Sequence, residues 1–245
     1  MRSPDKNDES KGGQSMKTCL LCSSPIRDEM SLTDIVRLTP LPNPSVCSDC
    51  NSQFSDLSTL PTCDGCGRRQ TAGMPSHCND CLRWEGPDSM RFMNTALFEY
   101  NSFMKDYMKQ YKFNGDYRLR KVFSQGVRDR LHKTNAVIVP IPVSMDTMAN
   151  RGFNQVTGLL EYVRFSEVLK VKLKRKTVPQ SAKNRRDRLE LIQPFEMIQS
   201  KKFLIKNKAI LLVDDVYTTG TTIRHAANLL YQYGATSVRG LTLAR

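Results

Sequence analysis

Two adjacent acidic residues, Asp214 and Asp215, end an apolar run in the stretch LLVDDVYTTGTTI, residues 211–223. A hydroxyl-rich turn follows, formed by Thr218, Thr219, Gly220, Thr221 and Thr222. Burying an unpaired carboxylate is costly, so we expect both acids to face the crevice where open α/β sheets bind ligands. The turn leads into a predicted helix, whose free N–H groups and dipole favour a phosphate. The pattern predicts a site for a phosphorylated sugar, in which the acids bind ribose hydroxyls or metal-bound waters.

All eight cysteines lie between residues 19 and 81, in four CxxC pairs. A CxxC turn offers two thiolates to one ion, so four pairs predict two closed, structural Zn²⁺ sites. Sequential pairing of neighbouring turns needs the least chain crossing, and cross-brace pairing is the alternative. The predicted ligands are Cys19, Cys22, Cys47, Cys50, Cys63, Cys66, Cys78 and Cys81.

A third group of residues is strongly basic and lies between 170 and 188, where Asp187 is the single acid. Phosphate contacts dominate the affinity of proteins for nucleic acids, so this stretch is a candidate binding segment for a nucleic acid. Two alternatives are a flap over the predicted phosphate site, because phosphate oxygens also favour cations, and a solvated loop. The candidates for nucleic-acid contact are Lys172, Lys174, Arg175, Lys176, Lys183, Arg185, Arg186 and Arg188.

The net charge of +13 is not spread evenly along the chain. Residues 16–84 contain six basic and seven acidic residues, whereas residues 85–245 have a net charge of +14. The second half therefore carries the attraction for an anionic partner. No stretch of 18 apolar residues and no export signal are present in the sequence, so we expect a cytoplasmic protein without membrane insertion.

Elements able to position these groups alternate along the second half of the chain. Strands are expected over 91–100, 136–144, 167–175, 209–214 and 237–244, and helices over 101–113, 117–132, 153–165 and 221–233. This alternation predicts an open, mostly parallel α/β sheet. We expect a disordered leader (1–15), a cysteine-rich module with two zinc sites (16–84) and an α/β domain (88–245).

The stretch VDDVYTTGTT (213–222) resembles the phosphoribosyl pyrophosphate signature of type I phosphoribosyltransferases. Together with the four CxxC turns, it makes the chain resemble the ComF family of competence proteins over nearly all residues after Met16. Further similar segments are 111–123, 140–144, 150–155 and 183–189.

The resemblance implies a twisted sheet of the type I phosphoribosyltransferase kind, preceded by a small zinc-ribbon module. It implies phosphoribosyl pyrophosphate with Mg²⁺ as the ligand of the acids and the threonine turn. It also implies that Pro140–Ser144, including Val143, face the pyrophosphate and that Arg151 lies near the same opening.

Two functions follow from this resemblance. The first is a competence factor for natural transformation that handles incoming single-stranded DNA with a ComFA-like helicase and recombination mediators. Its phosphoribosyl pocket would then be a ligand sensor or a remnant. The alternative is an active phosphoribosyltransferase that acts on an acceptor which the sequence does not identify.

Overall fold

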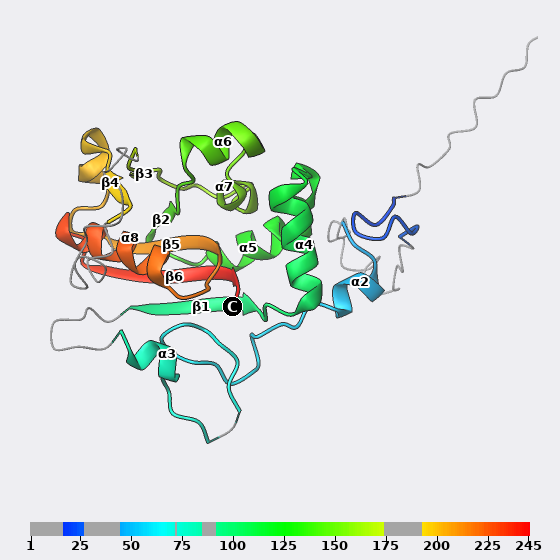
Figure 1. Ribbon diagram of the computed structural model, residues 1–245. Coiled ribbons are helices and arrows are strands. Elements are labelled where there is room, and N and C mark those ends of the chain that lie inside the picture. The colour runs from blue at the N-terminus through cyan, green and yellow to red at the C-terminus, as the bar shows by residue number, and fades with distance from the viewer. Residues whose placement is uncertain (1–16, 27–44, 72, 85–91, 174–192) are drawn as a thin grey trace, which may run out of the picture. The chain divides into compact units, whose positions relative to one another are not determined.

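The computed structural model describes residues 17–26, 45–71, 73–84, 92–173 and 193–245 (Figure 1). Contacts divide the chain into two compact units, residues 1–51 and 52–245. The predicted leader (1–15) and the predicted domain boundary near 85–87 both lie outside the described residues. Among the helices that the structure describes, none is long and apolar enough to cross a membrane.

The small unit contains two short segments that meet at a backbone hydrogen bond. Leu20 N donates to Ser45 O over 2.9 Å, which joins the first CxxC turn to the segment before the second. Helix α2 (Ser48–Ser52) begins within the second CxxC turn. Two turns are thus held side by side with little secondary structure around them.

The larger unit is built on four parallel strands in the order β1-β6-β5-β2 (Figure 1). These strands are β1 (Met93–Phe98), β2 (Val137–Pro140), β5 (Ala209–Val216) and β6 (Ser237–Ala244). Pro140 pairs with Val213, and Val213 pairs with Leu241, so the strands end at one edge. The predicted open, mostly parallel sheet is confirmed.

Helix α8 (Thr221–Gln232) connects β5 to β6 and packs against both strands. Its buried residues Ile223, Ala226 and Leu230 share a core with Ile210 and Leu212 of β5. The remaining elements are α3 (Asn79–Leu82), α4 (Ser102–Phe113), η1 (Tyr117–Val122), α5 (Ser124–Leu131), α6 (Met145–Arg151), α7 (Gln155–Leu159), β3 (Leu169–Val171), β4 (Phe195–Met197) and η3 (Gln199–Leu204).

Helix α4 shows how the apolar pattern fixes one of these elements. The Asn101 side chain accepts a hydrogen bond from Met104 N over 2.8 Å and caps the helix. The buried positions Met104, Tyr107, Met108 and Tyr111 recur every three or four residues, which places them on one helix face. The Met and aromatic stripe is therefore core packing.

Several expected elements are shorter than the sequence pattern indicates. The expected helix over 117–132 is divided at Phe123 into η1 and α5. The expected strand over 136–144 ends at Pro140, four residues earlier than the pattern indicates. The Ser144 side chain then accepts a hydrogen bond from Thr147 N over 3.1 Å and starts α6, a helix not expected from the sequence.

The region after α7 also differs from expectation. The helix expected over 153–165 is reduced to α7, and the strand expected over 167–175 is reduced to β3. Strand β3 pairs antiparallel with β4, which the sequence did not predict, so the two form a separate two-stranded sheet.

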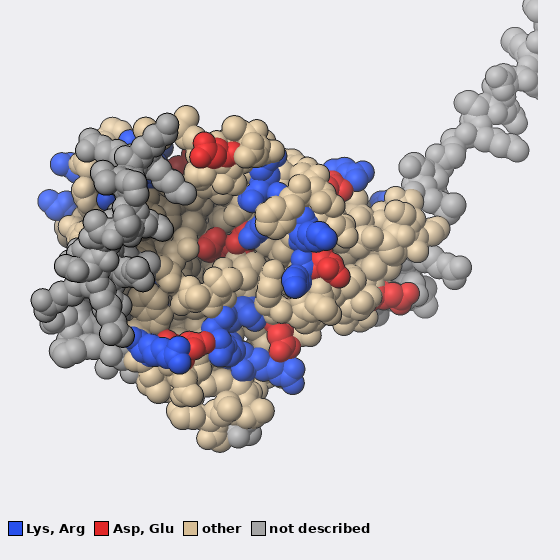
Figure 2. Space-filling model, viewed as in Figure 1, with Lys and Arg blue, Asp and Glu red and all other residues tan. Residues whose placement is uncertain are grey.

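Charges of both signs share the surface of the described residues. On the face shown in Figure 2, Lys and Arg side chains gather around α4 and below β1, with Asp and Glu side chains among them. Most of the predicted basic stretch falls in residues 174–192, which lie outside the described residues.

Candidate functional site

The acid pair lies near the carboxyl end of β5, the central strand between β6 and β2. Asp214 and Asp215 are only 9% and 4% exposed, so both carboxyl groups are largely buried, which the sequence pattern did not lead us to expect. Asp215 Oδ2 lies 2.5 Å from Lys112 Nζ of α4, which compensates the buried charge. The carboxyl group of Asp214, one residue earlier on β5, lies close enough to that of Asp215 for the two groups to interact.

Backbone amides stabilise both carboxylates. Asp214 Oδ1 accepts from Asp215 N over 2.9 Å, and Asp215 Oδ1 accepts from Val216 N over 2.7 Å. Burial, reinforced by the charge of Asp215, raises the pKa of Asp214 to about 8. The ligand-free pair therefore holds a proton at neutral pH, and a cation arriving beside it would favour proton release.

Gly220 closes the threonine turn against Tyr217. Its φ of +82° is in the left-handed region, and a Cβ there would collide with the Tyr217 hydroxyl. Arg224 Nε donates to that hydroxyl over 3.2 Å. The turn is thus packed directly on a buried aromatic ring, which limits its conformations.

The hydroxyl groups of the turn lie at the start of α8. Thr218, Thr219 and Thr222 are exposed, and Thr219 Oγ1 lies 2.9 Å from Thr221 Oγ1. The first N–H groups of a helix lack intrahelical acceptors, so this end favours an anion. Only Val216 and Tyr217 separate the acid pair at the end of β5 from the threonine turn that leads into α8.

The loop after β2 reaches the same edge of the sheet. Ile141 N donates to Val213 O over 2.9 Å, and Asn154 Nδ2 donates to Ile141 O over 3.1 Å. Val143 and Ser144 follow within three residues. Arg151, in the last turn of α6, donates to Gln155 Oε1.

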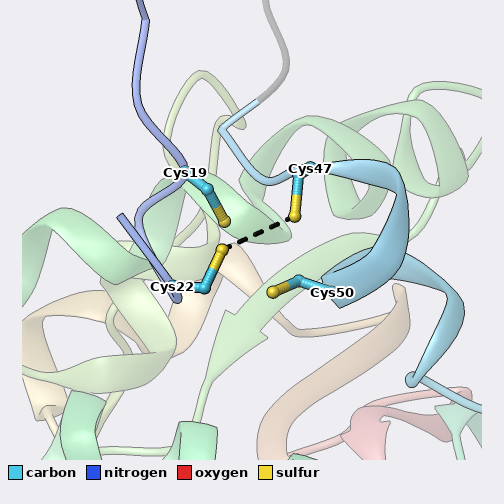
Figure 3. Close-up of side chains that lie close together, drawn as sticks. All are labelled: Cys19, Cys22, Cys47 and Cys50. Atoms are coloured by element: carbon cyan, nitrogen blue, oxygen red, sulfur yellow. Dashed lines mark hydrogen bonds between the residues drawn. The ribbon is translucent and has the colours of Figure 1, made fainter. Parts of the chain in front are cut away.

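The first cysteine cluster consists of Cys19, Cys22, Cys47 and Cys50 (Figure 3). Its sulfur atoms all lie within 4.8 Å of one another, and Cys22 and Cys47 are 3.6 Å apart. Four ligands around tetrahedral Zn²⁺ would be roughly 3.8 Å apart, so the residues fit this ion. Hydrogen bonds from Ser24 lower the pKa of Cys22 to about 6, which favours the thiolate that binds zinc.

The second cluster consists of Cys63, Cys66, Cys78 and Cys81 and has the same composition. The sulfur atoms of Cys63 and Cys81 are 3.7 Å apart, as are those of Cys66 and Cys78. These distances also fit tetrahedral zinc. Both clusters join neighbouring CxxC turns, so sequential pairing is confirmed and cross-brace pairing is excluded.

The second cluster is buried against the sheet. Cys63, Cys66 and Cys81 belong to the same core as Ile210 and Leu212 of β5. Asn94 of β1 donates to Cys66 O over 3.1 Å, which ties the cysteine turn to the edge strand.

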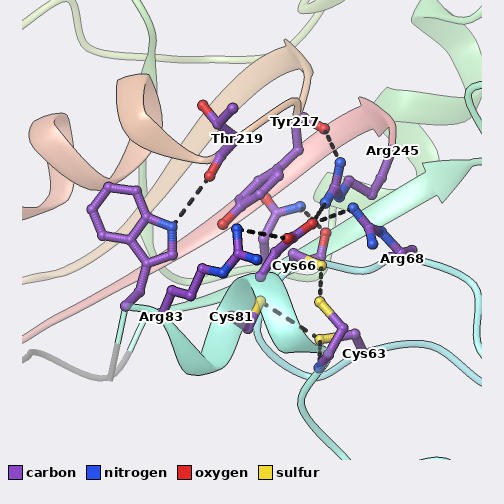
Figure 4. A network of polar contacts seen from close by, with 12 residues as sticks. Cys63, Cys66, Arg68, Cys81, Arg83, Tyr217, Thr219 and Arg245 are labelled. Atoms are coloured by element: carbon purple, nitrogen blue, oxygen red, sulfur yellow. Dashed lines mark hydrogen bonds and ion pairs between the residues drawn. The ribbon is translucent and has the colours of Figure 1, made fainter. Parts of the chain in front are cut away.

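Arg245 links this cluster to the threonine turn (Figure 4). Arg245 Nη1 donates to Tyr217 O over 3.2 Å, and the Arg245 guanidinium lies 5.2 Å from the Tyr217 ring centroid. Arg245 Nη2 also lies 3.7 Å from Asp80 Oδ2 of α3. Hydrogen bonding from Cys81, helped by Arg245, lowers the pKa of Cys66 to about 4. One guanidinium therefore contacts the metal-binding turn and the residue on which the threonine turn packs.

Most of the predicted basic stretch falls outside the described residues. Those positions are Lys174, Arg175, Lys176, Lys183, Arg185, Arg186 and Arg188. Lys170 is described on β3 and pairs with Glu196 of β4 over 2.9 Å, and Lys172 follows β3 directly.

Some contacts of this site were not predicted from the sequence. Lys112 lies in segment 111–123, one of the segments that resemble the family. Its position in the sequence does not indicate that it forms an ion pair with Asp215. Arg245 and Trp84 are single residues outside every motif. No feature of their local sequence pattern distinguishes them from other surface residues.

Comparison with known proteins agrees with this architecture. The family described as "Phosphoribosyl transferase domain" matches residues 116–245. "Competence protein ComFC" of Streptococcus pneumoniae (strain ATCC BAA-255 / R6) is 37% identical over 228 residues, covering 93% of this chain and 99% of the relative. "Competence protein ComFC" of Bacillus subtilis (strain 168) is 32% identical over 248 residues, covering 98% and 99%.

A third relative, "Competence protein F" of Haemophilus influenzae (strain ATCC 51907 / DSM 11121 / KW20 / Rd), is 29% identical over 213 residues, covering 82% of this chain and 90% of the relative. The fold and the site define a phosphoribosyltransferase-type α/β unit accompanied by two four-cysteine clusters. The chain belongs to the ComF family of competence proteins.

Proposed function

We propose that this chain is a cytoplasmic competence factor that handles incoming single-stranded DNA during natural transformation and binds phosphoribosyl pyrophosphate with Mg²⁺. A ComFA-like helicase and recombination mediators are the proposed partners. The names of the similar proteins support the role in competence. The ligand proposal depends on the site at the end of β5.

One observation carries the ligand proposal. The buried acid pair Asp214–Asp215 lies on the strand that leads, through the turn at Gly220, into α8. Carboxylates suit ribose hydroxyls or the waters of Mg²⁺, and the turn offers N–H and hydroxyl donors to a phosphate. A phosphorylated sugar requires both kinds of group in one place.

Thermal unfolding with and without Mg²⁺ and phosphoribosyl pyrophosphate tests this proposal. A ligand that binds only the folded chain at a hundred times its Kd stabilises it by about 2.7 kcal/mol. For a unit of this size that corresponds to a Tm increase of about 5–10 °C. We expect this shift in the wild type and its loss in Asp214→Asn/Asp215→Asn.

Each variant must be compared with its own ligand-free Tm, because removing the charge of Asp215 leaves Lys112 without its partner. Asp129→Asn is the control, since this acid lies on α5 with a side chain 60% exposed. A ligand shift that persists in the double variant would place the ligand elsewhere. No shift in the wild type would contradict the ligand proposal itself.

Single-stranded DNA binding is tested by fluorescence anisotropy at several salt concentrations. We expect Lys174→Ala/Arg175→Ala/Lys176→Ala to weaken binding and to reduce the slope of log K against log salt by about 2, at about 0.7 per lost phosphate contact. Lys202→Ala/Lys206→Ala/Lys208→Ala is the charge-matched control, because these lysines are exposed elsewhere. Equal losses in both variants would assign binding to general charge rather than to the basic stretch.

Turnover is measured separately. Pyrophosphate release on addition of candidate acceptors would support the alternative function, an active phosphoribosyltransferase. Ligand binding without release would support a sensor or a remnant pocket.

A further inference from the structure

Two connections run from the second cysteine cluster to the turn that forms the proposed phosphate site. The first passes through Arg245, which donates to Tyr217 O and lies 3.7 Å from Asp80, a residue between the metal-binding Cys78 and Cys81. The Tyr217 ring in turn fills the space beside Gly220 that a side chain would need. The position of the Tyr217 ring therefore depends on groups at the metal-binding turn. The ring in turn restricts the backbone conformations that the turn at Gly220 can adopt.

The second connection passes through Trp84, three residues after Cys81. Its indole Nε1 donates to Thr219 O over 3.3 Å, so it contacts the threonine turn directly. The Arg224 guanidinium lies 5.2 Å from the Trp84 ring centroid and 5.4 Å from that of Phe92. Arg224 also donates to the Tyr217 hydroxyl, so both connections end on the same aromatic residue.

We infer that the second cysteine cluster, when it holds its metal, positions the 217–221 turn for anion binding through Arg245 and Trp84. This inference rests on the proposed phosphate site and adds to it a metal-dependent control of its affinity. Four thiolates around Zn²⁺ retain a net negative charge, which attracts Arg245 and fixes its direction. Without the metal, α3 and Trp84 lose the link that holds Cys78 and Cys81 to the preceding turn, and the phosphate turn gains freedom.

The expected effect of these contacts on anion affinity is one of preorganisation. A turn already held with its N–H groups directed outward has less conformational entropy to lose when an anion binds. Arg245 and Trp84 are positioning residues in this account, because they contact the back of the turn rather than the proposed ligand.

Amide hydrogen exchange of the ligand-free protein tests the inference without any ligand. We expect Arg245→Gln to accelerate exchange of residues 217–222 by about tenfold, and Trp84→Phe, which keeps the ring and removes the donor, by about two- to fivefold. Arg83→Gln is the matched control, because Arg83 also lies near Asp80, at 3.8 Å, with an 81% exposed side chain. Unchanged exchange at 217–222 in Arg245→Gln and Trp84→Phe, or an equal increase in Arg83→Gln, would overturn the inference.

Metal dependence is tested by comparing the two clusters. Cys78→Ser should accelerate exchange at 217–222, whereas Cys22→Ser in the first cluster should leave these amides unchanged. Acceleration spread evenly over the β5 and β6 amides would indicate general destabilisation and would count against a positioning role. If Cys78→Ser does not fold, Trp84→Phe still tests the inference, because this substitution leaves all four cysteine ligands of the metal site in place.

Trp84 also provides a spectroscopic readout, because it is the only tryptophan in the chain. Titration of the wild type with Mg²⁺ and phosphoribosyl pyrophosphate should change its emission as Thr219 adjusts to the ligand. Affinity should fall about three- to tenfold in Arg245→Gln and remain unchanged in Arg83→Gln. Calorimetry could show that the wild type binds the ligand while its tryptophan emission stays unchanged and Arg245→Gln binds with the same affinity as the wild type. That result would reject this inference and retain the proposed ligand. No binding by the wild type would reject the ligand, while hydrogen exchange would still decide whether the cluster positions the turn.

Discussion

The two cysteine clusters have the same four ligands and differ in their surroundings. In the first, Cys22 is exposed and Cys47 is half-buried. In the second, Cys63, Cys66 and Cys81 are at most 2% exposed and lie in a core shared with β5 and α8. The same ligand set can therefore organise a small local unit or form part of the unit that contains the candidate ligand site.

The largest expected difference is in stability. Cys63→Ser/Cys66→Ser should lower the unfolding free energy of the larger unit by at least about 5 kcal/mol, because a structural zinc site contributes its binding free energy to folding. The corresponding fall in Tm is about 10–20 °C. Scanning calorimetry measures it.

Cys19→Ser/Cys22→Ser provides the comparison for that measurement. We expect the main transition of the larger unit to shift by less than about 2 °C, because these residues belong to the other compact unit. Equal shifts in the two variants would contradict the distinction between the clusters.

A second prediction concerns the rate of zinc removal. A chelator reaches exposed thiolates directly but reaches buried ones only after local opening. We therefore expect two kinetic phases of equal amplitude, with the slower phase at least about tenfold slower. In Cys22→Ser the fast phase should disappear. A single phase that accounts for both ions would show that burial does not protect the second cluster.

A third prediction is a pH dependence that sharpens the same comparison, because the raised pKa belongs to Asp214 in the unit of the second cluster. Between pH 4 and 8 the folded chain retains a proton on Asp214 that the unfolded chain releases near pH 3.9. The unfolding free energy of the larger unit should therefore fall as pH rises toward about 8.

Denaturant unfolding of the wild type and Asp214→Asn at pH 5, 6, 7 and 8 measures this contribution. The variant has no titrating group at this position, so its stability should fall less over the same range. Parallel pH profiles for the two proteins would show that Asp214 is ionised in the folded chain.

The clearest sequence patterns were the most predictive. Helix α4 was expected from the spacing of Met104, Tyr107, Met108 and Tyr111, because an amphipathic stripe is a property of neighbouring residues. The strand of Ile210 and Leu212 and the helix that follows the threonine turn were predicted for the same reason. The short strand β4 was not, because three residues give too little periodicity to distinguish a strand from a loop.

The candidate site was predicted in its residue types and in part of its geometry. The acid pair and the threonine turn are contiguous in sequence, so their proximity followed from one strand, one turn and one helix. Burial of both acids was not foreseen, because Lys112, which compensates Asp215, lies about one hundred residues away in the chain. No local pattern reports a pair separated by that distance.

The sequence by itself determined the number of cysteine pairs, the alternation of strands and helices, and the order of acids and threonines along β5 and its turn. Each of these depends on spacing between near neighbours, which the chain carries in every conformation. The tertiary structure alone decided that sequential CxxC turns pair, that the second cluster packs on the sheet, and that Arg245 contacts Tyr217 and Trp84 contacts Thr219. These are long-range contacts, and they form only where burial and charge compensation bring distant segments together.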